Sequence, residues 1–186
     1  MLRPRLRCAL AACLACCGTP VHATAPVESV PNVDLARYVG KWYEIASFPM
    51  YFQRNCLGDT TAQYAKTADG TISVVNRCRT KSGFDEARGK ASVVAGTGNA
   101  RLKVSFFWPF RADYWVIGLD ADYRWAVVGN PNRKYLWVLS RTPQLPRELL
   151  DEALKSAKSQ GFCSAVLGFR PRRHSRFPHV VAAVGL

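Results

Sequence analysis

Histidine is scarce in this chain, and its positions exclude several kinds of chemistry. The three histidines are His22, His174 and His179, so none lies between residues 34 and 165. A catalytic triad or a cysteine–histidine pair would have to borrow its base from one end of the chain. Zinc or haem held by histidine is disfavoured for the same reason. The sequence therefore predicts no catalytic residue, no metal site and no cofactor.

Long apolar segments are also missing. After Ala23, no run approaches the roughly 20 apolar residues that a membrane-spanning helix needs. Before it, an arginine-rich start leads into an apolar run over residues 8–17, which is too short to span a bilayer. Val21-His22-Ala23 is typical of a small-residue cleavage site. This pattern predicts that residues 1–23 are a secretory signal peptide.

A lipid anchor is the alternative interpretation of the same segment. Leu14-Ala15-Cys16-Cys17 is similar to a lipobox, in which the cysteine after the cleavage site receives a lipid. A lipid on Cys17 would put Cys16 where glycine or alanine is usual. A lipid on Cys16 places Ala15 well but Leu14 poorly. Two interpretations therefore stay open: a soluble exported protein, and a protein anchored through a lipid on Cys16 or Cys17.

Acidic residues are few, 13 against 26 lysines and arginines, which gives a formal net charge of +13. Part of the excess lies in residues 1–23 and in a basic C-terminal tail over residues 166–186. No predicted helix carries a basic stripe and no nucleic-acid motif is present, so nucleic acid is not an expected partner. Contact of the basic tail or surface with an anionic membrane or cell-surface polymer is an alternative function.

The chain does contain a series of short β-rich runs separated by turn residues. Residues 24–33, which include Pro26 and Pro31, are interpreted as a linker. A meander of eight strands that closes on itself has no free edge and encloses room for one small ligand. The predicted fold is all-β, an eight-stranded antiparallel up-and-down β-barrel. Its strands are expected at residues 42–48, 60–66, 71–78, 86–94, 100–107, 114–119, 125–129 and 135–141.

One helix is predicted after the last strand. Pro146 suits the first position of a helix and Gly161 suits its end. The positions between them form a single apolar stripe, which is expected to pack against the outside of the barrel. The stripe consists of Leu149, Leu150, Ala153, Leu154 and Ala157.

Three blocks of the sequence resemble the signature blocks of the lipocalin family. They are Gly40-Lys41-Trp42, residues 120–126 (DADYRWA) and residues 139–143 (LSRTP). The resemblance covers about residues 34–165 and is closest to the bacterial outer-membrane lipocalins and the apolipoprotein D group. It implies a protein of the periplasm or outer membrane of a Gram-negative bacterium that transports or stores a small hydrophobic ligand.

The resemblance also implies which residues close one end of the barrel. Trp42 would fill the bottom of the interior, and the guanidinium of Arg141 would lie across its indole, beside Gly40. A planar, permanently charged guanidinium suits this stacking. These three residues are therefore expected to have a structural role.

Side chains alternate between inside and outside along a strand, which predicts the lining of the ligand site. If Trp42 points inward, alternate residues of the first strand do too, and if Arg141 points inward, so do Leu139, Trp137 and Tyr135. Tyr114 and Val116 are expected to share the same cavity. The resulting site is mostly apolar, as suits a fatty acid or a lysophospholipid. The alternative is that the same aromatic residues simply fill a closed core. The expected ligand-binding residues are Glu44, Ala46, Tyr114, Val116, Tyr135, Trp137 and Leu139.

Three cysteines, Cys56, Cys78 and Cys163, remain outside the export segment. A hairpin centred near Asp69 would bring Cys56 and Cys78 almost opposite each other, which favours a disulfide between them. The rival pairing joins Cys56 to Cys163. If Cys56 or Cys78 were instead a free, inward-facing thiol, a lipocalin-type isomerase would be an alternative function.

Overall fold

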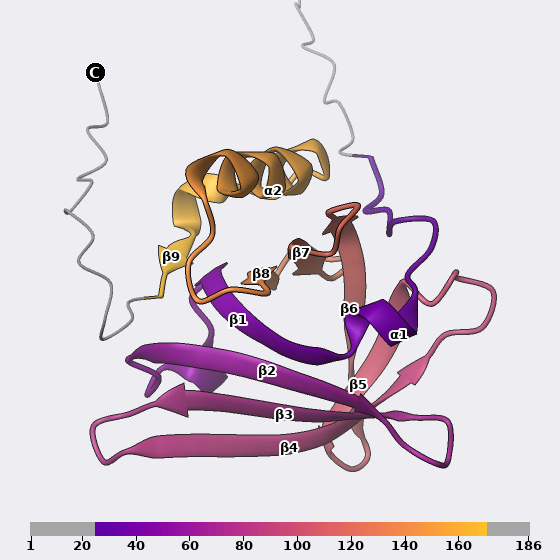
Figure 1. The fold of residues 1–186 in the computed structure, drawn as a ribbon, viewed down its shortest axis with the longest axis horizontal. Coiled ribbons are helices and arrows are strands. Elements are labelled where there is room, and N and C mark those ends of the chain that lie inside the picture. Colours follow the sequence, from indigo (N-terminus) through magenta and orange to yellow (C-terminus); the bar gives the residue numbers. More distant parts are fainter. Residues whose placement is uncertain (1–24, 171–186) are drawn as a thin grey trace, which may run out of the picture.

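The sheet of this protein closes into a barrel. The structure, a computed structural model, describes residues 25–170. Its strands form one antiparallel sheet in the order β2-β3-β4-β5-β6-β7-β8-β1-β9, and an additional pairing of β2 with β1 closes the ring (Figure 1). The predicted eight-stranded up-and-down barrel is confirmed. Its strands are β1 (Gly40–Ser47), β2 (Gly58–Lys66), β3 (Ile72–Arg79), β4 (Phe84–Val93), β5 (Arg101–Phe107), β6 (Phe110–Leu119), β7 (Trp125–Gly129) and β8 (Leu136–Ser140).

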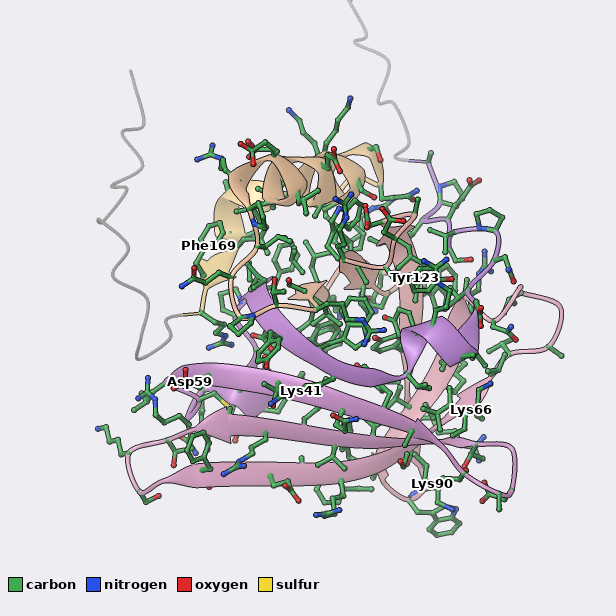
Figure 2. All side chains as sticks on the ribbon, in the orientation of Figure 1. Lys41, Asp59, Lys66, Lys90, Tyr123 and Phe169 are labelled. Atoms are coloured by element: carbon green, nitrogen blue, oxygen red, sulfur yellow. A yellow bond between two sulfur atoms is a disulfide. The ribbon has the colours of Figure 1, made fainter. Side chains whose placement is uncertain are left out.

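The up-and-down order puts alternate loops at opposite ends of the barrel. The β1–β2, β3–β4, β5–β6 and β7–β8 loops share one end, called the open end below. The other end carries the short helix α1 (Leu35–Tyr38) before β1 and is called the closed end. Figure 2 shows this division: Asp59 and Phe169 lie toward the open end, and Lys66 and Tyr123 lie toward the closed end. Within the described residues, no helix is long and apolar enough to cross a membrane.

Two apolar clusters account for the alternation along the strands. One fills the interior and includes Ala126 and Val128, whereas the other lies on the outer wall and includes Trp125 and Val127. Because both faces of β7 are covered, all of its residues are buried. A strand buried on both faces needs apolar residues at every position, as the sequence Trp-Ala-Val-Val-Gly provides.

The helix α2 (Arg147–Ser159) covers the outer wall, as predicted (Figure 1). Ala153 and Ala157 are fully buried in the outer cluster. Close approach of the helix depends on glycine, since a Cβ on Gly118 would lie 2.2 Å from the Ser156 hydroxyl oxygen. Phe162, just after the helix, packs over Gly129 in the same way.

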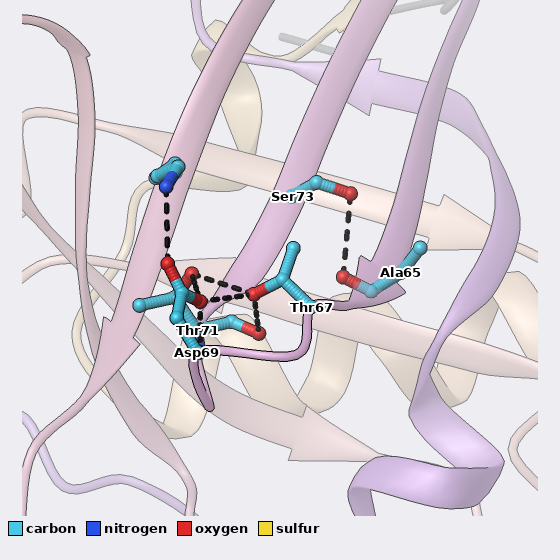
Figure 3. Close-up of polar contacts among 6 residues, drawn as sticks. Ala65, Thr67, Asp69, Thr71 and Ser73 are labelled. Atoms are coloured by element: carbon cyan, nitrogen blue, oxygen red, sulfur yellow. Dashed lines mark hydrogen bonds and ion pairs between the residues drawn. The ribbon is translucent and has the colours of Figure 1, made fainter.

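The β2–β3 turn at the closed end is held by one carboxylate. Asp69 accepts hydrogen bonds from the hydroxyls of Thr67 (2.5 Å) and Thr71 (2.7 Å), as Figure 3 shows. It also accepts one from the ammonium of Lys90 at 3.1 Å. These donors hold the pKa of the Asp69 carboxyl well below its usual range. Gly70 follows with φ +79°, a conformation that favours glycine.

The segment before the barrel corrects the expected linker at residues 24–33. Val27 and Val33 are 4% and 1% exposed, and the backbone N–H of Val30 donates to the carbonyl of Val116 at 2.8 Å. From residue 25 onward this segment therefore packs along the barrel. The two prolines in this segment suggested a linker, but its valines pack in both apolar clusters, Val33 in the interior and Val27 on the outer wall. The expected signal peptide and lipid-anchor cysteines lie outside the described residues.

The chain after the helix corrects the expected boundary at residue 165. A short strand, β9 (Gly168–Phe169), pairs with the end of β1 through Ala46 and Ser47. A 3₁₀ turn, η2 (Ser164–Val166), precedes it. The fold thus continues into the segment that was assigned to a basic tail, and the later residues of that tail lie outside the described part.

A disulfide ties the open-end loop before β2 to the end of β3. Cys56 and Cys78 are bonded with their Cα atoms 5.5 Å apart, whereas Cys163 is free and exposed. The predicted pairing is confirmed and the rival pairing with Cys163 is wrong. The hairpin alone brings the two cysteines together, because Cys56 lies just beyond the Gly58–Arg79 pair of β2 and β3.

The disulfide should contribute measurably to stability. Replacing both cysteines (Cys56→Ser/Cys78→Ser) removes a cross-link over a sequence separation of 22 residues. The free energy of unfolding should fall by about 3 kcal/mol in the chain-entropy account. Urea unfolding followed by fluorescence measures it, with Cys163→Ser as the control that should leave the midpoint unchanged. Equal loss in the control would contradict the assignment.

Candidate functional site

The closed end is plugged by an arginine stacked on a tryptophan. The Arg141 guanidinium carbon lies 3.8 Å from the centre of the Trp42 ring, and Trp42 is fully buried. Arg141 also donates to the carbonyls of Val39 and Lys41 (3.1 Å each), Tyr38 (3.0 Å) and Arg37. Gly40 leaves room for this contact, since its Cβ would meet Arg141 Nη1 at 3.4 Å.

The Asp120 turn at the same end is a structural device. The Asp120 carboxylate accepts hydrogen bonds from the Arg124 side chain (2.8 Å) and from the backbone N–H groups of Asp122 and Arg124. The Arg124 side chain is the main cause that holds the pKa of this carboxyl below its usual value. The carboxylate therefore serves to shape the β6–β7 loop.

Four of the expected lining residues meet in the interior cluster. Val116 and Leu139 are buried there, and Tyr114 and Trp137 are partly buried against it. They come from β6 and β8, the two strands that flank β7. The geometry thus brings these side chains together inside the barrel.

Three tyrosine hydroxyls form the polar group of the interior. Tyr114 Oη lies 2.8 Å from Tyr38 Oη and 3.1 Å from Tyr64 Oη. Burial raises the pKa of Tyr64 to about 12 and raises the pKa values of the other two well above their usual range. All three hydroxyls stay protonated. A cavity of about 10 Å³ beside them leaves room for about one water molecule.

Ala46 was expected in the ligand site, and the structure places it on the opposite wall. The pairing of β1 with β8 shifts between Glu44 and Ala46, which marks a β-bulge. The extra residue reverses the alternation, so Ala46 packs in the outer cluster while Ser47, fully buried, follows it. Nothing in the sequence marks the bulge, and strict alternation therefore failed here.

Glu44 lies inside and is paired with Arg170, which belongs to the predicted basic tail. Arg170 Nε lies 2.6 Å from Glu44 Oε1, and the two side chains are 17% and 4% exposed. Ser47 (2.8 Å) and Gln53 (2.9 Å) also donate to the Glu44 carboxylate. Arg170 donates further to the Cys56 carbonyl at 3.3 Å. The carboxylate and the guanidinium form a buried ion pair toward the open end.

A hollow adjoins this ion pair at the open end. Its volume is about 320 Å³, and Met50, Tyr51, Arg54 and Arg170 are among the residues that line it. The 3₁₀ turn η1 (Tyr51–Gln53) in the β1–β2 loop forms one side. Beside it, the rings of Phe52 and Tyr135 are 5.9 Å apart, and Tyr135 stacks on Trp137 at 6.0 Å. Tyr135 therefore lies near the entrance of the barrel and just before β8.

Comparison with protein families identifies this arrangement. The family model described as "Lipocalin-like domain" matches residues 33–172. The chain belongs to the lipocalin family.

Several relatives are similar along most of this lipocalin. The outer membrane lipoprotein Blc of Vibrio cholerae is 43% identical over 150 residues, 79% of this chain and 85% of that protein. Temperature-induced lipocalin-1 of Arabidopsis thaliana is 40% identical over 73% of this chain and 77% of that protein. Insecticyanin of the tobacco hornworm has the same fold, with a TM-score of 0.67 and 20% identity over 82% of this chain and 87% of that one.

The thiols of this lipocalin do not suit the isomerase alternative. Both cysteines that could have supplied an inward-facing thiolate, Cys56 and Cys78, are joined to each other. Cys163 is exposed after the helix. Among the described residues, no three histidine, cysteine or acidic side chains gather in a way that could hold a metal ion.

The plug should matter for stability. Arg141→Ala removes the stacked guanidinium and its hydrogen bonds to the chain before β1, and should cost about 1–3 kcal/mol. Trp42→Ala should cost about 3–5 kcal/mol because a large buried aromatic ring is lost. Urea unfolding measures both, with the exposed Arg88→Ala as a control. An unchanged unfolding midpoint for Arg141→Ala, with ligand affinity lost, would reassign Arg141 to binding.

The Glu44–Arg170 pair should show coupling. Arg170→Ala leaves a buried carboxylate without its cation and should cost about 3 kcal/mol. Arg170→Ala/Glu44→Gln removes the charge as well and should recover most of that loss. Chemical unfolding of the two single variants and the double variant measures the coupling energy. If the losses simply add, the pair does not stabilise the fold in the way described.

Proposed function

We propose that this lipocalin binds a single-chain anionic amphiphile, a fatty acid or a lysophospholipid, and carries or stores it in the cell envelope. The observation that carries the proposal is the hollow of about 320 Å³ at the open end, which is lined both by apolar side chains such as Met50 and by Arg54 and Arg170. Its volume lies at the lower end of the range of ligand pockets, about 300–1,000 Å³. The chain performs no covalent chemistry in this proposal.

The path for an acyl chain runs from the hollow along aromatic side chains. Phe52, Tyr135 and Trp137 are in successive ring contact and lead from the exposed loop toward the interior. The cavity at the tyrosine cluster holds only about 10 Å³. An acyl chain therefore lies on the open-end side of Tyr114, where half-buried side chains can give way.

The charges around the hollow favour an anionic headgroup. Arg170 is neutralised by Glu44 at 2.6 Å. The Arg54 side chain is exposed, and its guanidinium carbon lies over the Tyr51 ring, 4.1 Å from the ring centre. A carboxylate or phosphate at the hollow would gain the guanidinium of Arg54 as a partner.

The location proposed is the periplasm or the outer membrane, with the lipid anchor on Cys16 or Cys17. The lipobox-like segment supports this interpretation, and relatives 42–43% identical are named outer membrane lipoproteins. An envelope location also suits the disulfide, because exported proteins keep such bonds.

Ligand binding should be seen by tryptophan fluorescence. Titration of the delipidated protein with a C18 fatty acid or a lysophospholipid should give a Kd in the micromolar range or tighter, about −8 kcal/mol. Trp137→Ala should weaken binding by about ten-fold or more. The same change should lower the free energy of unfolding by less than it lowers the free energy of binding. Trp115→Ala, which alters a partly buried tryptophan packed on the outer cluster, is the matched control. A flat titration with both ligands would refute the proposal.

The headgroup preference has its own control. The wild-type protein should bind the fatty acid more tightly than the alcohol of equal chain length, and Arg54→Gln should reduce that preference. Arg147→Gln, in the exposed pair with Asp151 on α2, changes the net charge equally and should leave it intact. Equal affinity of the wild-type protein for acid and alcohol would remove the role of Arg54.

A further inference from the structure

The exposed apolar side chains of this protein gather at one end of the barrel. In the part of the chain that the structure describes, the large hydrophobic residues with high exposure all lie in open-end loops, at strand ends beside them, or in the segment around β9 that pairs with the end of β1. Monomeric proteins rarely expose such a group without a partner. The residues are Tyr51, Phe52, Leu57, Phe84, Phe107, Trp108, Phe110, Val166 and Phe169.

The tip of the β5–β6 hairpin is the most exposed part of this group. Phe107, Trp108 and Phe110 are 78%, 89% and 76% exposed. The pairing of β4 with β5 reaches only as far as Lys90 and Ser105, whereas β5 and β6 stay paired to Phe107 and Phe110. Beyond Ser105 the hairpin therefore separates from β4, which continues along β3 as far as Phe84, and its three aromatic rings are left exposed.

The loops of the open end carry charge of one sign. The loops at residues 48–57, 80–83, 108–109 and 130–135 contain no acidic residue, and they carry Arg54, Lys81, Arg133 and Lys134. Arg111 directly follows the aromatic tip. The closed end differs, because its turns and cap hold four carboxylates. These are Asp34, Asp69, Asp120 and Asp122.

We propose that the open end docks on the surface of a bilayer that contains anionic phospholipid, with the Phe107–Phe110 hairpin tip inserted among the headgroups. Trp108 suits this depth because its ring is apolar while its indole N–H is polar, and the rings of Phe107 and Phe110 add apolar area that leaves water on insertion. The surrounding lysines and arginines attract anionic headgroups. Docking in this orientation places the hollow at the open end against the lipid layer from which a ligand would be taken.

The path of the N-terminal segment fits this orientation. The carbonyl of Ala25 accepts a hydrogen bond from Arg133 in the β7–β8 loop, so the chain enters the described part beside an open-end loop. Cys17 precedes Ala25 by eight residues in the sequence, a distance of at most about 28 Å when extended. An acyl anchor on Cys17, which rests on the proposed location, would hold this loop near the membrane.

Vesicle sedimentation tests the docking surface. The full chain carrying Cys16→Ser and Cys17→Ser, which excludes an acyl anchor, should sediment with vesicles of phosphatidylglycerol and phosphatidylethanolamine and much less with phosphatidylcholine. Phe107→Ser/Trp108→Ser/Phe110→Ser should reduce partitioning by about ten-fold or more. Lys81→Gln/Arg111→Gln/Lys134→Gln should reduce it by about a hundred-fold. Lys66→Gln/Lys155→Gln/Lys158→Gln removes the same charge elsewhere and should have little effect.

Fluorescence locates the contact. Vesicles should shift the tryptophan emission of the unlipidated chain to the blue, and Trp108→Phe should abolish the shift while sedimentation stays close to the starting level. Absence of vesicle binding, or equal loss with the Lys66 control set, overturns the proposal. So does a dimer that forms through the aromatic tip in sedimentation velocity and no longer binds vesicles.

The docking test is separable from the ligand proposal. The hairpin-tip variant should keep its affinity for the C18 fatty acid in solution, because its three residues do not line the hollow. A protein that binds vesicles through the tip but no fatty acid would refute only the proposed ligand. A protein that binds fatty acid and ignores vesicles would refute only the docking surface.

Discussion

The contact between Arg141 and Trp42 ties the end of the last barrel strand to the start of the first. Arg141 follows β8 and reaches the carbonyls of Arg37, Tyr38, Val39 and Lys41, so α1 and the entry into β1 are held by one side chain. The Trp42 indole N–H donates to the Tyr38 carbonyl at 2.8 Å and cannot turn away. Because Trp42 is fixed inward, the alternation of side chains along β1 places Glu44, two residues later, inside the barrel as well.

Much of the fold could be predicted because its signals are local. Alternating apolar residues, turn residues and an apolar helical stripe mark the elements. The hairpin around Asp69 also sufficed for the disulfide. The failures have a different origin. The prediction placed Ala46 on the wrong wall of the barrel, because a β-bulge leaves no signal in the sequence. The burial of Val27 and Val33 was not predicted, because the prolines in their segment suggested a linker.

Arg170 was missed for a further reason. Its partner Glu44 is 126 residues away, and a run of arginines near the C-terminus looks like a solvated tail when read alone. A buried carboxylate on an inward position of β1 was the available signal, because such a group needs a cation or several donors. One part of the site could therefore be predicted and the other could not. The aromatic wall follows from the alternation of side chains along the strands, whereas the charged end depends on a contact between residues far apart in the sequence.

The pair of Glu44 and Arg170 also links the order of synthesis to the completion of the interior. Glu44 belongs to the first strand made, and Arg170 follows the last. Until residue 170 has left the ribosome, a closed barrel would bury the Glu44 carboxylate without the Arg170 guanidinium that lies 2.6 Å from it, which is costly. The barrel can thus acquire its full stability only when nearly the whole chain is present. A nascent chain remains easier to unfold up to that moment, which would suit the envelope location proposed above, because an exported chain crosses the membrane before it folds.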